Sequence, residues 1–62
     1  MKVGRAIGLI ENDGWRLVRT RGSHRQFKRP HKPGLVTIAG RPSADLTPAT
    51  AASILRQAGL KG

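Results

Sequence analysis

The sequence predicts a small α+β domain in which two helices pack on one face of a three-stranded antiparallel sheet. Three observations predict this fold: a helical pattern at each end of the chain, three strand patterns between them, and turn residues at the junctions. With 62 residues, the chain is expected to form one domain over 1–62. Packing both helices on one sheet face buries their apolar stripes and leaves the other face in solvent.

Residues 2–12 are predicted to form the first helix. Their apolar side chains recur at the i, i+3, i+4, i+7 spacing of one buried stripe, at Val3, Ala6, Ile7 and Ile10. Gly4 and Gly8 each weaken the helix by up to about 1 kcal/mol relative to alanine. Asn12, Asp13 and Gly14 then supply a stop and a turn.

Residues 15–20 predict the first strand. Its side chains alternate between two faces, with Trp15 and Leu17 on one and Arg16, Val18 and Thr20 on the other. Because apolar residues occur on both faces, the alternation leaves open which face points inward. Arg21, Gly22 and Ser23 follow as a short hairpin connection, in which Gly22 is free to take a positive φ.

Residues 24–29 predict the second strand, and here the alternation is sharper. Phe27 is the only large apolar residue of the run, so it is expected to point inward. His24, Gln26 and Lys28 then share the opposite, solvent-facing side. Residues 30–34 are predicted to form a loop, because two prolines forbid a continuous ladder. Residues 35–39 are β-branched and apolar, and they complete an antiparallel meander.

The last helix follows an irregular segment over 40–46. Thr47 is a good N-cap, and Pro48 occupies the first helical position, where its missing N–H costs nothing. The apolar stripe of this helix consists of Ala51, Ile54, Leu55 and Ala58. Gly59 is placed for a left-handed C-cap, and Leu60 is placed to fold back onto Leu55 in a Schellman motif.

The charge balance predicts a polyanionic partner. Twelve Lys and Arg face three acids, Glu11, Asp13 and Asp45, which gives a net charge of +9. Most of the cations are arginines, which suit bidentate phosphate recognition. The acids are too few for paired-carboxylate or metal-dependent chemistry, and the absence of cysteine excludes disulfides and thiolate catalysis. We therefore expect no metal, no cofactor and a nucleic acid as ligand.

The sequence predicts no membrane partner. No apolar run reaches the ~20 residues that a membrane-spanning helix needs, and the first residues lack the apolar stretch of a secretory signal. The expected compartment is therefore the cytoplasm.

Two histidines, His24 and His31, are the side chains suited to proton transfer at neutral pH. A neutral imidazole among arginines is able to take the proton of a ribose 2′-hydroxyl, while the cations stabilise charge on the phosphate. RNA supplies this nucleophile itself, so no metal is needed and DNA is spared. The residues alone leave plain phosphate contact as the alternative. Trp15 and Phe27 could stack on bases, but core positions are favoured for both.

Four segments resemble the HicA toxins, also called YcfA-type proteins. They are Gly14-Trp15, the run Gly22-Ser23-His24-Arg25-Gln26-Phe27, Val36-Thr37-Ile38, and Ile54-Leu55-Arg56-Gln57-Ala58-Gly59-Leu60. The resemblance covers nearly the whole chain in order. Many family members carry a proline, often followed by a histidine, after the third strand. This chain has Ala39-Gly40-Arg41-Pro42 there, so that second histidine is absent.

The resemblance implies a double-stranded-RNA-binding-like fold, with the order helix, three strands, helix. It implies an mRNA interferase, a ribosome-independent endoribonuclease of a type II toxin–antitoxin module. It also implies that His24 is required for cleavage and that a HicB antitoxin covers this histidine. The basic and polar residues expected to touch RNA are those near His24, namely Arg21, Ser23, Arg25, Lys28 and Arg29.

Two alternatives share the predicted fold and the basic surface. One is a non-catalytic RNA-binding module that inhibits translation by occupying RNA. The other is a small basic component of a ribonucleoprotein.

Overall fold

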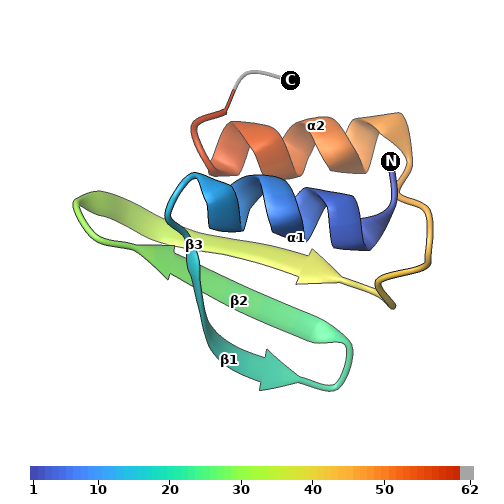
Figure 1. Cartoon of the computed structure of the whole chain (residues 1–62), viewed down its shortest axis with the longest axis horizontal. Helices are drawn as coiled ribbons and strands as arrows, with labels where there is room; N and C mark the ends of the chain where they lie inside the picture. The colour runs from blue at the N-terminus through green and yellow to red at the C-terminus, as the bar shows by residue number, and fades with distance from the viewer. Residues whose placement is uncertain (61–62) are drawn as a thin grey trace.

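The computed structural model describes residues 1–60 and has the predicted order of elements. The elements are α1 (Val3–Asn12), β1 (Arg16–Arg21), β2 (His24–Arg29), β3 (Lys32–Ala39) and α2 (Pro48–Gln57). The strands form one antiparallel sheet in the order β1-β2-β3. Both helices lie on the same side of this sheet, against β3 and each other (Figure 1). The predicted α+β fold, in its double-stranded-RNA-binding-like order, is confirmed.

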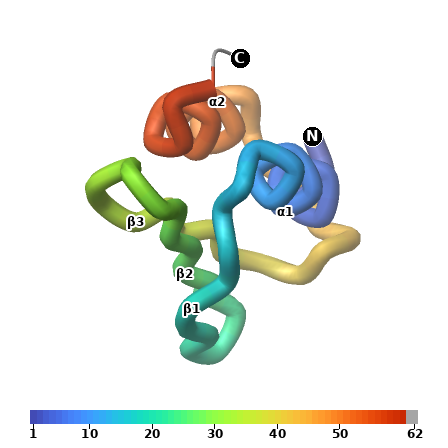
Figure 2. The backbone as a smooth tube through the Cα atoms, turned by 60° about the vertical axis from the view of Figure 1, so that its left-hand side comes forward, coloured from blue at the N-terminus to red at the C-terminus, as the bar shows by residue number. Residues whose placement is uncertain are grey.

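The hydrophobic core lies between β2, β3 and the two helices. Its buried members are Val3, Ala6, Ile10, Trp15, Phe27, Val36, Ile38, Ile54 and Ala58. Trp15 and Phe27 are each only 1% exposed, so both aromatic side chains are core residues, as predicted. β1 lies farthest from the helices (Figure 2), and all six of its residues are exposed. The sheet therefore extends beyond the helix layer on its β1 side.

The loop over 40–46 caps the first turn of α1. The helix begins at Val3, one residue later than predicted. Its N-cap residue, Lys2, makes no capping hydrogen bond with its side chain. Instead the Val3 N–H donates to the Ala44 carbonyl and the Gly4 N–H to the Pro42 carbonyl, both at 2.9 Å. A Cβ at Gly4 would lie 3.3 Å from the Pro42 oxygen, so the glycine permits this close approach.

Both helices end in a Schellman motif built on a glycine. Gly59 has a φ of 77°, and the Leu60 N–H donates to the Leu55 carbonyl at 2.8 Å, which confirms the predicted end of α2. α1 ends in the same way: Gly14 has a φ of 106°, and the Trp15 N–H donates to the Ile10 carbonyl at 3.0 Å. Each motif turns an apolar residue back toward the core.

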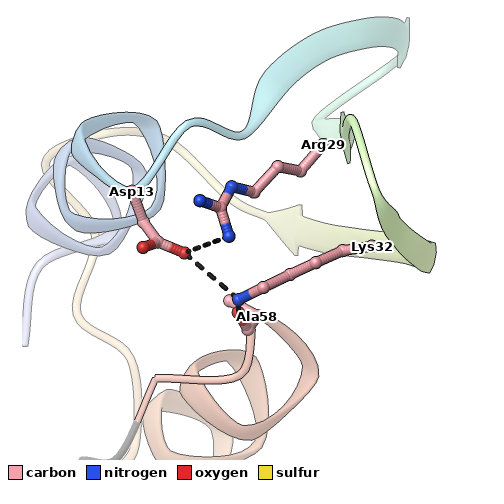
Figure 3. A network of polar contacts seen from close by, with 4 residues as sticks. All are labelled: Asp13, Arg29, Lys32 and Ala58. Atoms are coloured by element: carbon pink, nitrogen blue, oxygen red, sulfur yellow. Dashed lines mark hydrogen bonds and ion pairs between the residues drawn. The ribbon is translucent and has the colours of Figure 1, made fainter.

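A small network of charges joins these two helix ends to the sheet (Figure 3). The Asp13 Oδ2 atom lies 3.6 Å from Arg29 Nη1 and 3.5 Å from Lys32 Nζ. Lys32 Nζ also donates to the Ala58 carbonyl at 3.0 Å, so a cation meets the negative end of the α2 dipole. We call these residues the Asp13 network. It connects the ends of α1 and α2 to the hairpin between β2 and β3.

The third strand begins three residues earlier than predicted. The connection after β2 is a two-residue turn of Pro30 and His31, and β3 starts at Lys32 with Pro33 inside it. The register between β2 and β3 shifts between Phe27 and Arg29, so the strand is irregular where the proline lies. β3 is an edge strand, and an irregular edge tolerates a residue without an N–H donor.

The first strand is also shifted, since it begins after Trp15 and includes Arg21. The hairpin turn is therefore only Gly22 and Ser23, with a φ of 59° at Gly22 as the first position of a type II′ turn requires. No helix within residues 1–60 is long and apolar enough to span a membrane.

Replacing Gly8 by alanine should stabilise the protein. Gly8 lies inside α1, and an added Cβ would meet no atom within 4 Å. Gly8→Ala should therefore raise the free energy of unfolding by about 0.5–1 kcal/mol, because alanine loses less backbone entropy in a helix. Urea unfolding followed by the fluorescence of the single, buried Trp15 measures the change.

Gly4→Ala is the matched control in the same helix. Its Cβ would press on the Pro42 carbonyl oxygen, so it should gain clearly less stability than Gly8→Ala. Equal gains for the two variants would contradict the close approach of α1 to the 40–46 loop.

Candidate nucleic-acid interface

His24 lies at the start of β2 on the side of the sheet opposite Phe27. Its neighbours across the ladders are Arg21 on β1 and Ala39 on β3. Cross-strand partners point to the same face, so Arg21 stands beside the imidazole. His24 is exposed, and none of the side-chain hydrogen bonds of residues 1–60 involves it. The imidazole is therefore open to a ligand from solvent.

A bulge in β1 brings additional arginines to the same side. Leu17 pairs with Phe27 and Arg19 pairs with Gln26, so Val18 is an extra residue between two pairs. The bulge moves Arg19 onto the His24 side, together with the two arginines at the ends of the strand. We call this side the open face. Its residues are Arg16, Val18, Arg19, Arg21, His24, Gln26, Lys28, Leu35, Thr37 and Ala39.

Because of the bulge, the alternation predicted for β1 is wrong beyond Val18. Thr20 was expected opposite Leu17, but it pairs with Arg25 and so shares the Phe27 side. Arg16 and Arg19 were missed as candidate site residues because a strict period of two assigns them to different faces. The available signal was Val18 next to Leu17, two apolar residues in succession within a strand.

The acidic residues of the chain all lie on the helix side of the sheet. Asp45 is 3.1 Å from Lys2 Nζ, Asp13 belongs to the Asp13 network, and Glu11 lies in the last turn of α1. The open face carries four cations, and none of them forms an ion pair within the described chain; they are Arg16, Arg19, Arg21 and Lys28. Uncompensated cations on one surface create a positive field that attracts a polyanion.

The residues predicted from sequence to touch RNA divide between the two sides. Arg21 and Lys28 share the open face with His24, and Ser23 lies in the adjoining turn. Arg25 and Arg29 alternate with these residues and lie on the Phe27 side. Arg25 Nη1 donates to the Gly40 carbonyl at 2.7 Å, and Arg29 belongs to the Asp13 network. These two guanidinium groups are held by contacts inside the fold.

His31 lies at the other end of β2 from His24. It occupies the turn between β2 and β3 with a φ of 68°. Five residue steps along β2, at about 3.3 Å each, place roughly 17 Å between the two ends of that strand. The fold therefore does not bring the two histidines together as an acid–base pair.

Comparison with known proteins gives one family. The sequence model of a family described as HicA toxin of bacterial toxin-antitoxin matches residues 5–60. The match spans the three strands, the second helix and most of the first. A search of curated proteins finds no match.

The two sides of the sheet should respond differently to the loss of an arginine. Arg25→Ala should lower the free energy of unfolding by roughly 1–2 kcal/mol, because it removes a partly buried, charge-assisted hydrogen bond to Gly40. Arg19→Ala should change that free energy by less than about 0.5 kcal/mol. It should instead reduce the slope of log K against log salt for a single-stranded oligonucleotide by about 0.7.

Urea unfolding and binding titrations at several salt concentrations measure the two quantities. Arg56→Ala, on the helix side, is the control for charge loss away from the open face and should leave the slope unchanged. A reduced slope for Arg56→Ala with an unchanged slope for Arg19→Ala would place the binding surface on the helices.

Proposed function

The chain belongs to the HicA toxin family, and from this membership and the geometry of the open face we propose that it is an mRNA interferase with His24 as its catalytic residue. Membership makes the chain a toxin of a toxin–antitoxin system, and HicA toxins generally cleave RNA. The observation that carries the choice of site is the exposed imidazole of His24 on a sheet face that bears four cations without an acidic partner in the described chain.

In the proposed reaction, the neutral imidazole of His24 takes the proton of a ribose 2′-hydroxyl. The 2′-oxygen attacks the adjacent phosphorus, and the bond from phosphorus to the 5′-oxygen breaks. The products are a 2′,3′-cyclic phosphate and a 5′-hydroxyl. His31 is at the far end of β2, so we assign the proton of the leaving oxygen to solvent, which reaches the open face.

The cations of the open face have two roles in this proposal. Arg21 stands beside His24 and stabilises the charge that develops on the phosphate oxygens. Arg16, Arg19 and Lys28 hold the flanking phosphates, and Ser23 contacts the backbone from the turn. The carboxylates that would bind a divalent metal lie on the helix side, which supports a metal-independent reaction.

Arg25 and Arg29, also predicted from sequence as RNA contacts, act in this proposal by holding β2 in place. Arg25 donates to the Gly40 carbonyl and so holds the segment that follows β3 against the start of β2. Arg29 fixes the other end of the strand to Asp13. Both are therefore positioning residues.

The proposed protein partner is a HicB-type antitoxin that covers His24. The family implies an antitoxin in general, and the exposed cations around His24 support the open face as its binding surface. An acidic partner is steered to uncompensated cations. It would then exclude RNA by occupying the same surface.

His24→Ala should abolish RNA cleavage and growth arrest while leaving RNA binding and the fold intact. The side chain is exposed, so the free energy of unfolding should change by less than about 0.5 kcal/mol. Induced expression with total RNA analysis and in vitro cleavage of purified protein measure the loss. Wild-type products should carry 2′,3′-cyclic phosphates.

Cleavage by His24→Ala at the wild-type rate would show that the assignment is wrong. Stoichiometric inhibition of translation by the wild type with intact RNA would instead establish the occupancy alternative.

His31→Gly is the matched histidine control, and it makes a prediction of its own. Because His31 has a φ of 68°, glycine should relieve backbone strain and raise the free energy of unfolding by up to about 1 kcal/mol. The variant should cleave RNA at the wild-type rate. Loss of cleavage in a folded His31→Gly protein would mean that His31 supplies a proton after all.

A further inference from the structure

A hollow of about 520 Å³ lies on the open face, and it extends from Gln26 away from His24. Its lining consists of Val18, Arg19, Gln26, Lys28, Gly34 and Leu35. Gln26 is two residues along β2 from His24, which corresponds to roughly 7 Å. A volume of this order falls within the range of small-ligand sites. The hollow is therefore large enough for part of a ligand that reaches the imidazole.

Two irregularities of the sheet form this hollow. On β1, the bulge at Val18 lies beside Gln26. On β3, residues 33–35 stand opposite Lys28, because the ladder passes from the pair Phe27–Val36 to the pair Arg29–Lys32. Bulges bend strands and increase their twist. Gly34 adds no side chain, and a Cβ there would meet no atom within 4 Å.

The walls and floor of the hollow differ in chemistry. Val18 and Leu35 are 53% and 43% exposed, and they lie on the two strands that flank β2. These strands are about 10 Å apart, which is two strand spacings. Gln26 lies between them, half-buried and without a side-chain hydrogen bond in the described chain. Arg19 and Lys28 add positive charge at the rim.

We propose that this hollow is a subsite for one unstacked nucleobase of the substrate RNA, and that Gln26 determines which base is accepted. Apolar side chains on both sides suit the faces of a base, as in pockets that hold extruded bases. The Gln26 amide offers a donor beside an acceptor, which is the pattern that reads a base edge. The proposal rests on the proposed function, because it needs RNA on the open face.

The two cations that line the hollow favour a nucleotide over an uncharged ligand. A base in the hollow places its own phosphates near Arg19 and Lys28. The strand then continues along β2 toward His24, where the proposed cleavage occurs. A single-stranded ligand is required, because a duplex keeps its bases stacked and paired.

The first experiment measures binding without cleavage. Short homopolymeric 2′-deoxy oligonucleotides lack the attacking hydroxyl, and their dissociation constants are measured by NMR titration. The wild type should prefer one base by about tenfold, the effect of one bidentate base contact. Gln26→Ala should lose this preference, and Val18→Ser should weaken binding of the preferred base several-fold.

Leu17→Ser is the matched control on β1. Leu17 is 49% exposed, similar to Val18, but it pairs with Phe27 and lies outside the hollow. It should bind all four oligonucleotides as the wild type does. Equal affinity of the wild type for all four, or an unchanged preference in Gln26→Ala, would overturn the proposal even if the protein cleaves RNA.

The second experiment maps cleavage sites in a random-sequence RNA. Wild type should show a base preference at one fixed position, and the cleavage sites of Gln26→Ala should lose that preference. If the wild type cleaves no RNA but still binds one base selectively, the proposed function is wrong and the nucleobase subsite is supported. If Val18→Ser weakens antitoxin binding but not nucleotide binding, the hollow accepts a protein side chain, and the proposal fails.

Discussion

Phe27 is the one large apolar side chain of the central strand, and its burial in the core determines where every other β2 side chain points. Because strand side chains alternate, His24, Gln26 and Lys28 must face away from the helix layer. A slip of one residue would bury the histidine and expose the phenylalanine. The cost of exposing Phe27 would be about 1.5–3 kcal/mol. The position of the site is therefore a consequence of the core.

The second constraint is the distribution of charge between the two sides of the sheet. The chain has only three acids, and all of them lie on the helix side. Asp13 is the most heavily used, because it meets Arg29 and Lys32 where both helices end (Figure 3). These two cations share the single negative charge of Asp13. The four cations of the open face have no acidic partner in the described chain, so this face keeps its full positive charge beside His24.

Much of this arrangement could be predicted from sequence. The sharp alternation around Phe27, the N-cap at Thr47 and the glycine end of α2 are local signals, and each one is confirmed. The same alternation puts Arg25 and Arg29 on the Phe27 side, although the sequence analysis grouped them with His24 as expected RNA contacts. Their intramolecular partners, Gly40 and Asp13, did not, because they are distant in the sequence.

The predictions that failed concern irregular backbone. Pro33 was assigned to a loop because a regular ladder excludes proline, yet an edge strand with a shifted register accommodates it. The Val18 bulge left only an indirect signal, two successive apolar residues at Leu17 and Val18, since a period of two has no place for an extra residue. Register shifts depend on how neighbouring strands pair, and the sequence of one strand alone does not determine that pairing.

The location of β1 explains why the bulge in this strand affects the open face more than the stability of the core. The helices contact β3 and each other, so β1 adds little to the core and all its residues remain exposed. An edge of this kind invites pairing with another chain, and positively charged side chains such as Arg16, Arg19 and Arg21 oppose it. The same arginines border His24 on the open face. A strand freed from packing is thus able to carry both the bulge that forms the hollow and the charges that would hold a nucleic acid.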